Sequence, residues 1–252
     1  MTILQKIIDH KRKEVHALPD VFPARETPII PFLPTLQQNT LALITEIKRA
    51  SPSKGIINKH VNPVQQALSY ENAGASAISV LTDFTFFKGT MDDLRQVKQA
   101  VTIPVLNKDF IIHKKQIDYA YASGADIILL IVAALDDPTL KQLYEYASSL
   151  QLHIIVEVHN ANELQRAEAI HAQIIGINHR NLHDFSVDIT RSETLRSKAK
   201  SDAYFIAESG IQNREDATYL ANVGVDGLLV GESLMQANRT EDLVKSLRVT
   251  KC

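Results

Sequence analysis

Two spacings of hydrophobic residues alternate along most of the chain. From residue 41 onward, short apolar runs typical of buried β-strands alternate with longer segments whose apolar residues recur at helical spacing. The runs predict strands near residues 41–48, 77–82, 103–107, 126–132, 153–158, 173–178, 203–208 and 225–230. The helical spacing predicts helices near residues 63–73, 90–100, 114–123, 137–150, 161–170, 189–199, 213–222 and 239–248. The pattern therefore repeats one strand–helix unit.

A short glycine-containing phrase recurs where a predicted helix passes into a strand. It reads AGAS at 73–76, SGAD at 123–126 and VGVD at 223–226, and glycine is common where a helix ends before a parallel strand. Buried strands that alternate with helices in this way predict an α/β fold, a (β/α)₈ TIM barrel. An open doubly wound sheet is the alternative, and it is less favoured because no predicted strand is followed by a GxGxxG turn.

The first 40 residues do not follow the repeat. Residues 2–17 have helical spacing with Thr2 as a candidate cap, and five prolines within 19–34 prevent a long regular element. A short helix can follow the proline-rich segment and end at Asn39. We expect one barrel domain over residues 1–252, with an N-terminal helical extension (1–40), a lid or plug, preceding the barrel proper (41–252).

Composition and charge narrow the class of protein. The formal net charge of −2 argues against a nucleic-acid-binding surface. The single cysteine, Cys252, excludes an intrachain disulfide and fits a reducing compartment. Charged residues stand near the N-terminus where a signal peptide needs an apolar core, and the longest apolar run, 127–135, is too short to span a bilayer. We expect a cytoplasmic protein that binds neither nucleic acid nor membrane.

Polar residues end seven of the eight predicted strands, where barrel enzymes carry their reacting groups. The first strand ends in Glu46 and Lys48, which share a face because they are two residues apart. The loop at 51–55 that comes next is rich in hydroxyls and positive charge and suits a phosphate. A structural ion pair at the strand end explains Glu46 and Lys48 equally well.

Lys108 and Glu157 are each the lone ionisable residue at the end of an apolar predicted strand. Partial burial there would tune their proton affinity toward acid–base catalysis, and the alternative for each is a salt bridge across the barrel mouth. Ser209-Gly210 and Gly231-Glu232 follow the last two strands, where barrels often bind phosphate through backbone N–H groups. Ordinary turns are the alternative. We assign only the backbone of Glu232, since an inward carboxylate repels an anion.

The histidines and phenylalanines give weaker signals. His179 and His183 are four residues apart, but no HExxH motif or third ligand accompanies them, so we expect solvated surface histidines and no metal. We expect Phe86 in the core, whereas Phe87 and Phe110, beside two strand ends, are equally suited to the wall of an aromatic substrate site. No GxSxG motif, strand-end cysteine or P-loop is present.

Together these motifs resemble the indole-3-glycerol phosphate synthase family, barrels of the tryptophan pathway. The matching stretches follow the family's order across nearly the whole chain: 46–53 (EIKRASPS), 81–83 (LTD), 86–89 (FFKG), 105–110 (VLNKDF), 156–158 (VEV), 176–182 (GINHRNL), 207–211 (AESGI) and 229–234 (LVGESL). Asn107 and His179 depart from the commonest pattern, and neither replaces an expected catalytic group.

The resemblance implies conversion of 1-(2-carboxyphenylamino)-1-deoxyribulose 5-phosphate to indole-3-glycerol phosphate, CO₂ and water, without a cofactor. It implies that Lys108 is the general acid and Glu157 the acid–base partner in dehydration. Lys48 would hold the substrate carboxylate or share the acid role, with Glu46 keeping it charged, and Asn178 would orient the substrate. The substrate-binding residues it implies are Ser51, Phe87, Phe110, Arg180, Ser209, Gly210, Gly231 and Glu232.

Two other functions fit parts of the pattern. A second phosphate-binding barrel, phosphoribosylanthranilate isomerase, commonly uses a cysteine or aspartate at the strand ends, and Cys252 is misplaced for that role. A catalytically idle barrel that binds a phosphorylated metabolite would have lost an acid–base residue, whereas Lys48, Lys108 and Glu157 are all present. The sequence assigns no partner enzyme of the tryptophan pathway.

Overall fold

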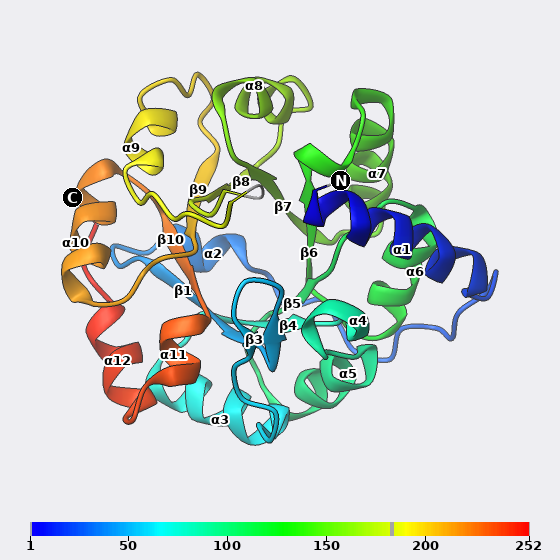
Figure 1. Ribbon diagram of the computed structural model, residues 1–252, viewed down its shortest axis with the longest axis horizontal. Coiled ribbons are helices and arrows are strands. Elements are labelled where there is room, and N and C mark those ends of the chain that lie inside the picture. The colour runs from blue at the N-terminus through cyan, green and yellow to red at the C-terminus, as the bar shows by residue number, and fades with distance from the viewer. Residues whose placement is uncertain (1, 182–183, 252) are drawn as a thin grey trace.

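The computed structural model describes residues 2–181 and 184–251. Its central element is a closed barrel of parallel strands in the order β1-β10-β9-β8-β7-β6-β5-β4 (Figure 1). The strands are β1 (Ala42–Ile47), β4 (Ala77–Leu81), β5 (Val105–Lys108), β6 (Ile127–Ile131), β7 (His153–Val158), β8 (Ile174–Asn178), β9 (Tyr204–Glu208) and β10 (Gly227–Val230). A small antiparallel hairpin, β2 (Ala50–Ser51) with β3 (Gly55–Ile56), follows β1. The predicted TIM barrel is confirmed.

Helices surround the strands, as Figure 1 shows. The main ones are α3 (Pro63–Ala73), α5 (Met91–Ala100), α6 (Lys114–Ala122), α7 (Asp137–Ser149), α8 (Ala161–Ala169), α9 (Arg191–Arg196), α10 (Arg214–Val223) and α12 (Thr240–Leu247). Shorter turns are α4 (Phe84–Phe87), η1 (Val132–Ala134) and α11 (Glu232–Gln236). The helix predicted over 189–199 is shorter than expected, because Asp188 accepts hydrogen bonds from Thr190 in a turn ahead of it. No helix in the described residues is long and apolar enough to cross a membrane.

The glycines of the recurring phrase stand at helix-to-strand joints, as the sequence predicted, and have a left-handed backbone conformation. Gly74, Gly124 and Gly224 have φ angles of +102°, +96° and +85°, which favour glycine over any residue with a Cβ. At Gly74 and Gly224 this left-handed residue ends the preceding helix, and its N–H bonds back into the last turn. The repeated phrase therefore ends one helix and directs the chain into the next strand.

The inner face of the barrel is apolar up to its carboxyl end. Every second side chain of a strand points inward, and the inward residues include Ala42, Ile44, Ala77, Leu106, Ile127, Leu129, Ile131, Ile155, Ile174, Ile206 and Leu229, all buried in one cluster. On β5, β7 and β9 the next inward positions are Lys108, Glu157 and Glu208. The two-residue spacing that fills the core thus places ionisable groups directly above it.

The N-terminal extension contacts both ends of the barrel. Helix α1 (Ile3–Ala17) lies at the mouth, where the buried Lys11 Nζ forms ion pairs with Asp83 Oδ2 at 2.9 Å and Asp109 Oδ1 at 2.8 Å. Around α2 (Leu33–Leu36), Phe32 and Leu36 are fully buried in the inner apolar cluster. The extension therefore covers part of the mouth and also plugs the interior.

Candidate active site

A cavity of about 1030 Å³ opens at the carboxyl ends of the strands. It is also lined by Ile3, Leu4 and Ile7 of α1. The cavity brings together every site residue predicted from the sequence: Glu46, Lys48, Ser51, Phe87, Lys108, Phe110, Glu157, Asn178, Arg180, Ser209, Gly210, Gly231 and Glu232. These segments are distant in the sequence and become neighbours because the parallel strands of a barrel end at the same rim.

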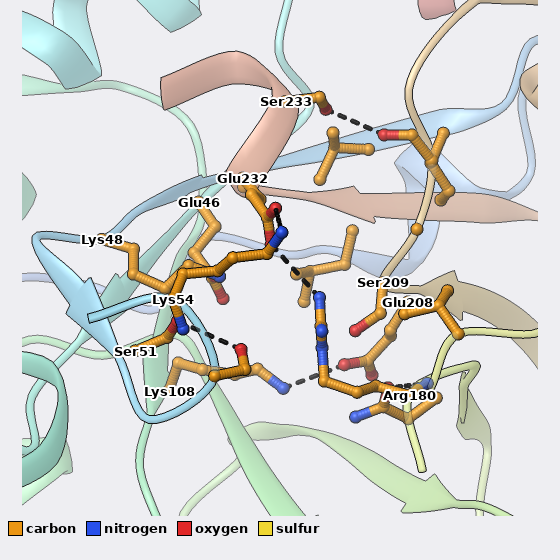
Figure 2. A pocket seen from close by; sticks show the side chains of 18 of the residues that line it. Glu46, Lys48, Ser51, Lys54, Lys108, Arg180, Glu208, Ser209, Glu232 and Ser233 are labelled. Atoms are coloured by element: carbon orange, nitrogen blue, oxygen red, sulfur yellow. Dashed lines mark hydrogen bonds and ion pairs between the residues drawn. The ribbon is translucent and has the colours of Figure 1, made fainter. Parts of the chain in front are cut away.

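Lys108 stands at the centre of a buried charged cluster. Its Nζ donates to Oε2 of Glu157 at 3.0 Å and to Oε2 of Glu208 at 2.9 Å, and Figure 2 shows it pointing toward Glu208. Burial alone would lower the pKa of Lys108, but the charges of Glu157, Glu208 and Glu46 outweigh burial and raise it. Lys108 is therefore an ammonium ion in the free protein. The salt bridge that the sequence analysis gave as the alternative to catalysis, here between Lys108 and Glu157, lies inside the cavity.

Glu157 is held ionised by the same cluster. Burial would raise the pKa of this carboxyl, but the Lys108 charge, then the His159 charge and hydrogen bonds from Lys108 and Asn178, lower it. Asn178 ends β8, in register with Glu208 on β9 and one strand from Glu157. The amide predicted to orient the substrate thus also orients the predicted acid–base carboxylate.

Glu208 is a functional candidate that we did not assign from the sequence. Burial and the neighbouring carboxylates raise its pKa to about 7 despite the Lys108 charge, and its Oε1 is buried without a hydrogen-bond partner. Gly176 makes room for it, since a Cβ there would lie 2.2 Å from Oε1. Its sequence signal was the inward spacing from Ile206, the same spacing that identifies Lys108 after Leu106.

Replacing Glu208 should stabilise the protein at alkaline pH. A raised pKa in the folded state means that stability is full at low pH and is lost as pH rises through about 7, because the buried carboxylate must then ionise. Glu208→Gln removes that loss. We expect its Tm to exceed that of the wild type at pH 8, at roughly 2–4 °C per kcal/mol for a chain of this size, and the gap to close at pH 4. Thermal melts across this range check it; a gap that is constant with pH contradicts the shifted ionisation.

Glu46 and Lys48 form the ion pair that the first strand predicted. Lys48 Nζ lies 2.8 Å from Glu46 Oε1, and the other oxygen of Glu46 accepts from Ser79 at 3.4 Å. Gly231 on the adjoining segment makes this arrangement possible, since a Cβ there would lie 2.6 Å from Glu46 Oε1. Both charges line the cavity, so the pair is part of the site as well as of the strand end.

Glu232 faces the cavity with its side chain, whereas the sequence assigned a role only to its backbone. Its Oε2 accepts from Arg180 at 3.2 Å and its Oε1 lies 3.3 Å from Lys54 Nζ (Figure 2). The two cations offset the carboxylate, so the repulsion expected for an anion is reduced. Glu232 also begins the short helix α11 directly after β10, the position where barrels bind phosphate.

The Ser209-Gly210 turn has an unusual backbone that a buried histidine supports. Ser209 and Gly210 have φ angles of +70° and +78°. His179 Nδ1 donates to the carbonyl of Ser209 at 2.8 Å, and Nε2 lies 2.7 Å from Ser192 Oγ. The prediction of a solvated surface histidine is wrong for His179, which is fully buried. Burial lowers its pKa to about 4, so the ring is neutral and acts as a spacer beneath the turn.

Phe86 has different surroundings from Phe87 and Phe110 in the folded chain. Phe87 and Phe110 both line the cavity, with ring centroids 5.9 Å apart and planes tilted by 32°. The prediction that Phe86 lies in the core is wrong: it is half-buried on α4 and packs edge-on against His10 of α1. None of the residues of the short helix α4 is buried. Phe86 therefore packs against α1 and does not enter the barrel core.

No metal site is evident within 2–181 and 184–251: no group of three or more His, Cys, Asp or Glu side chains there is arranged to hold an ion. Leu182, His183 and Cys252, which entered the sequence interpretation, lie outside the described residues. The histidine spacing considered from the sequence is thus tested only for His179, whose ring nitrogens are both occupied by protein groups.

The chain resembles known proteins along nearly its whole length. The model of the family described as indole-3-glycerol phosphate synthase matches residues 4–247. The indole-3-glycerol phosphate synthase of Listeria monocytogenes is 49% identical over 253 residues, covering 100% of both chains. That of Oceanobacillus iheyensis is 48% identical, covering 99% of this chain and 97% of the relative.

Solved structures support the fold alone. A thiamine phosphate pyrophosphorylase from Pyrococcus furiosus has a TM-score of 0.62 at 19% identity, covering 82% of this chain and 93% of its own. An N-acetylmannosamine-6-phosphate 2-epimerase from Clostridium perfringens has a TM-score of 0.63 at 15% identity, covering 84% and 93%. The fold is therefore common to distant proteins, whereas the near full-length matches at almost half identity are specific, and the chain belongs to the indole-3-glycerol phosphate synthase family.

Proposed function

We propose that the cluster around Lys108 carries out the chemistry of this family by acid–base catalysis. The chain is a decarboxylating lyase of tryptophan biosynthesis that acts on a phosphorylated small molecule. Its reaction closes the indole ring of 1-(2-carboxyphenylamino)-1-deoxyribulose 5-phosphate with loss of CO₂ and water. Each of these steps moves a proton or an electron pair that a side chain of the cavity can accept, donate or stabilise.

Ring closure needs a proton for the ketone oxygen. As the ring carbon that bears the carboxylate attacks the ketone carbon, the C=O electron pair moves to oxygen, which becomes an alkoxide unless it is protonated. Lys108 is an ammonium ion that lines the cavity, so it can donate that proton to the developing alkoxide. Lys48, whose ion pair with Glu46 supports a charged ammonium group, holds the substrate carboxylate or shares this acid role.

The later steps restore aromaticity. Loss of CO₂ returns the C–C electron pair to the ring, and water then leaves by departure of the hydroxyl and loss of a proton from the ring methylene carbon. Glu157 is an ionised, buried carboxylate within 3.0 Å of Lys108 Nζ, and it serves as the acid–base partner in this dehydration. The observation that carries the proposal is this lysine–carboxylate pair at the floor of a cavity that also gathers the predicted binding residues.

The remaining lining residues suit the two ends of the substrate. Phe87 and Phe110 offer an aromatic wall to the anthranilate ring. Ser209-Gly210 and the start of α11 at Gly231-Glu232 present backbone N–H groups for the phosphate, with Ser51 and Arg180 at the same cavity.

A carboxylate introduced into the phosphate end should weaken substrate binding first. We expect Ser209→Asp to raise KM by on the order of tenfold or more with a smaller change in kcat, because like charges repel at close range. Steady-state kinetics check this, with Ser209→Ala as the matched uncharged variant. A fall in kcat at unchanged KM would place the phosphate elsewhere.

The function itself is tested by product analysis. Purified protein should convert the carboxyphenylamino substrate to an indole chromophore while releasing one CO₂ for each indole formed, as the balanced reaction requires. A protein that binds the substrate without releasing CO₂ would be the idle binder considered from the sequence.

A further inference from the structure

The reaction cannot balance without a proton from solvent. The ketone oxygen leaves as water and so gains two protons, of which the ring methylene carbon supplies one. The substrate carboxylate leaves as CO₂ and supplies none. After each turnover, Lys108 and Glu157 together therefore hold one proton fewer than before it. Solvent must return that proton to a pair that is buried at the floor of the cavity. This proton requirement depends on the proposed function.

A chain of titratable groups leads away from Glu157 on the side opposite Lys108. His159 follows β7, and its Nε2 lies 3.3 Å from Oε1 of Glu157, the oxygen that Lys108 does not use. Its Nδ1 lies 3.1 Å from Oε2 of Glu163 on α8. Exposure rises along this path, from 3% for the Glu157 side chain to 10% for His159 and 14% for Glu163.

The outer end of this path meets a second cavity. A hollow of about 460 Å³ is lined by His159 and Glu163 together with Arg12 of α1 and the exposed Asn160. The main cavity is lined by Glu157 but not by His159 or Glu163. The imidazole thus stands in the wall between the two cavities, and none of the predicted substrate-binding residues lines the second one.

The charges around His159 suit a proton carrier. Burial would lower the pKa of its ring, but the hydrogen bond to Glu163 and the charges of Glu157, Glu163 and Glu208 outweigh burial and raise it. From the remaining elements, Arg12 of α1 and Arg191 of α9 line the same hollow. Nε2 is buried and, although close to Glu157, has no well-aligned hydrogen bond, so the ring is not locked by its partner on the catalytic side.

We propose that His159 and Glu163 form the route by which solvent protons reach the catalytic carboxylate Glu157. The N–H bond at Nε2 of the imidazolium breaks as an O–H bond forms on Oε1 of Glu157. The neutral ring, which keeps its proton on Nδ1, then turns about its Cβ–Cγ bond to bring Nε2 to the second cavity. There a buffer acid or water returns a proton to Nε2, and the ring turns back. Glu163 contributes to this route by accepting the Nδ1–H of the ring and offsetting the charge of the imidazolium at the outer end of the path. His159 is therefore a positioning and relay residue that acts through Glu157 and does not touch the substrate.

A simpler role for these residues is to cap α8. Glu163 does accept from the backbone N–H of His159 at 2.8 Å and from Asn160 Nδ2 at 2.6 Å, which satisfies groups at the start of that helix. A capping role predicts a lower Tm in variants of His159 and no response of kcat to added buffer. The relay predicts a rate that depends on the proton donor in solution.

Chemical rescue separates the two. We expect His159→Ala to lower kcat by on the order of tenfold, less than loss of the general acid itself, with KM little changed because the binding residues remain. Imidazole added at pH 6.5 should restore kcat in a saturable manner through the second cavity, and the same concentration at pH 8, where imidazole is mostly neutral, should restore less. Wild type and His60→Ala, an exposed histidine on a loop, serve as controls that imidazole should not accelerate.

Glu163→Gln is a second variant, which keeps the side-chain length and leaves the imidazole ring in place. We expect it to lower kcat less than His159→Ala does, and we expect a higher buffer concentration to relieve that loss. Unchanged kcat in His159→Ala overturns the proposal. A loss of kcat in folded His159→Ala and Glu163→Gln that imidazole does not relieve also overturns it. Failure of the wild type to make the indole product would instead refute the proposed function.

Discussion

Lys108→Met should lower kcat by a factor on the order of 10² to 10⁴, the usual share of general acid–base catalysis, while KM changes little. Methionine keeps most of the side-chain length but cannot give a proton to the ketone oxygen. The phosphate end and the aromatic wall, which determine much of substrate binding, are untouched. Steady-state kinetics on the folded variant, with its Tm measured alongside, check the expectation.

Lys108→Arg sharpens this test, because it keeps the positive charge between Glu157 and Glu208 but cannot serve as an acid. If Lys108 only forms a salt bridge, arginine should restore turnover; if it donates a proton, arginine should stay nearly as slow as methionine. Lys98 gives a matched control, since its Nζ pairs with the buried Asp126 at 2.6 Å outside the cavity. Lys98→Met should lower Tm and leave kcat per folded molecule intact.

Glu157→Gln should slow the dehydration more than the ring closure. The amide preserves the shape of the side chain and a hydrogen bond, but it cannot exchange a proton with the hydroxyl-bearing intermediate. We expect kcat to fall by on the order of 10² or more. In a single turnover, CO₂ release should precede indole formation, since decarboxylation comes before loss of water.

Rapid-quench measurement of CO₂ and indole in the same reaction gives the outcome directly. A lag between the two products, absent in the wild type, places Glu157 in the dehydration. Equal slowing of CO₂ release and indole formation would instead place its effect at or before the loss of CO₂, and would move the acid–base role in dehydration to another residue.

The fold could be predicted from the sequence because its physical signal is local and repeated. The strands have continuous apolar runs since both faces of a parallel barrel are buried, and the glycine phrases mark the joints. The barrel in turn fixes the positions of Lys108 and Glu157, whose inward direction follows from their spacing after Leu106 and Ile155.

The features that the sequence did not predict depend on contacts between distant segments. Glu208 has the same inward spacing as Lys108, but its raised pKa depends on burial beside Glu157, which no local pattern reports. His179 occupies a loop in the sequence, and only the packing of Ser192 and Ser209 around it makes it a buried, neutral support. Phe86 was misplaced because apolar character alone does not distinguish a core from the space beneath an added helix.

Turnover after chelation tests whether side chains alone supply the acids and bases of the reaction. Purified protein treated with EDTA should convert the carboxyphenylamino substrate to indole-3-glycerol phosphate at an undiminished rate, followed by the indole fluorescence, with one CO₂ for each indole. Activity that disappears on chelation and returns with a single divalent ion would contradict catalysis by Lys108 and Glu157 alone, as would consumption of substrate without an indole product.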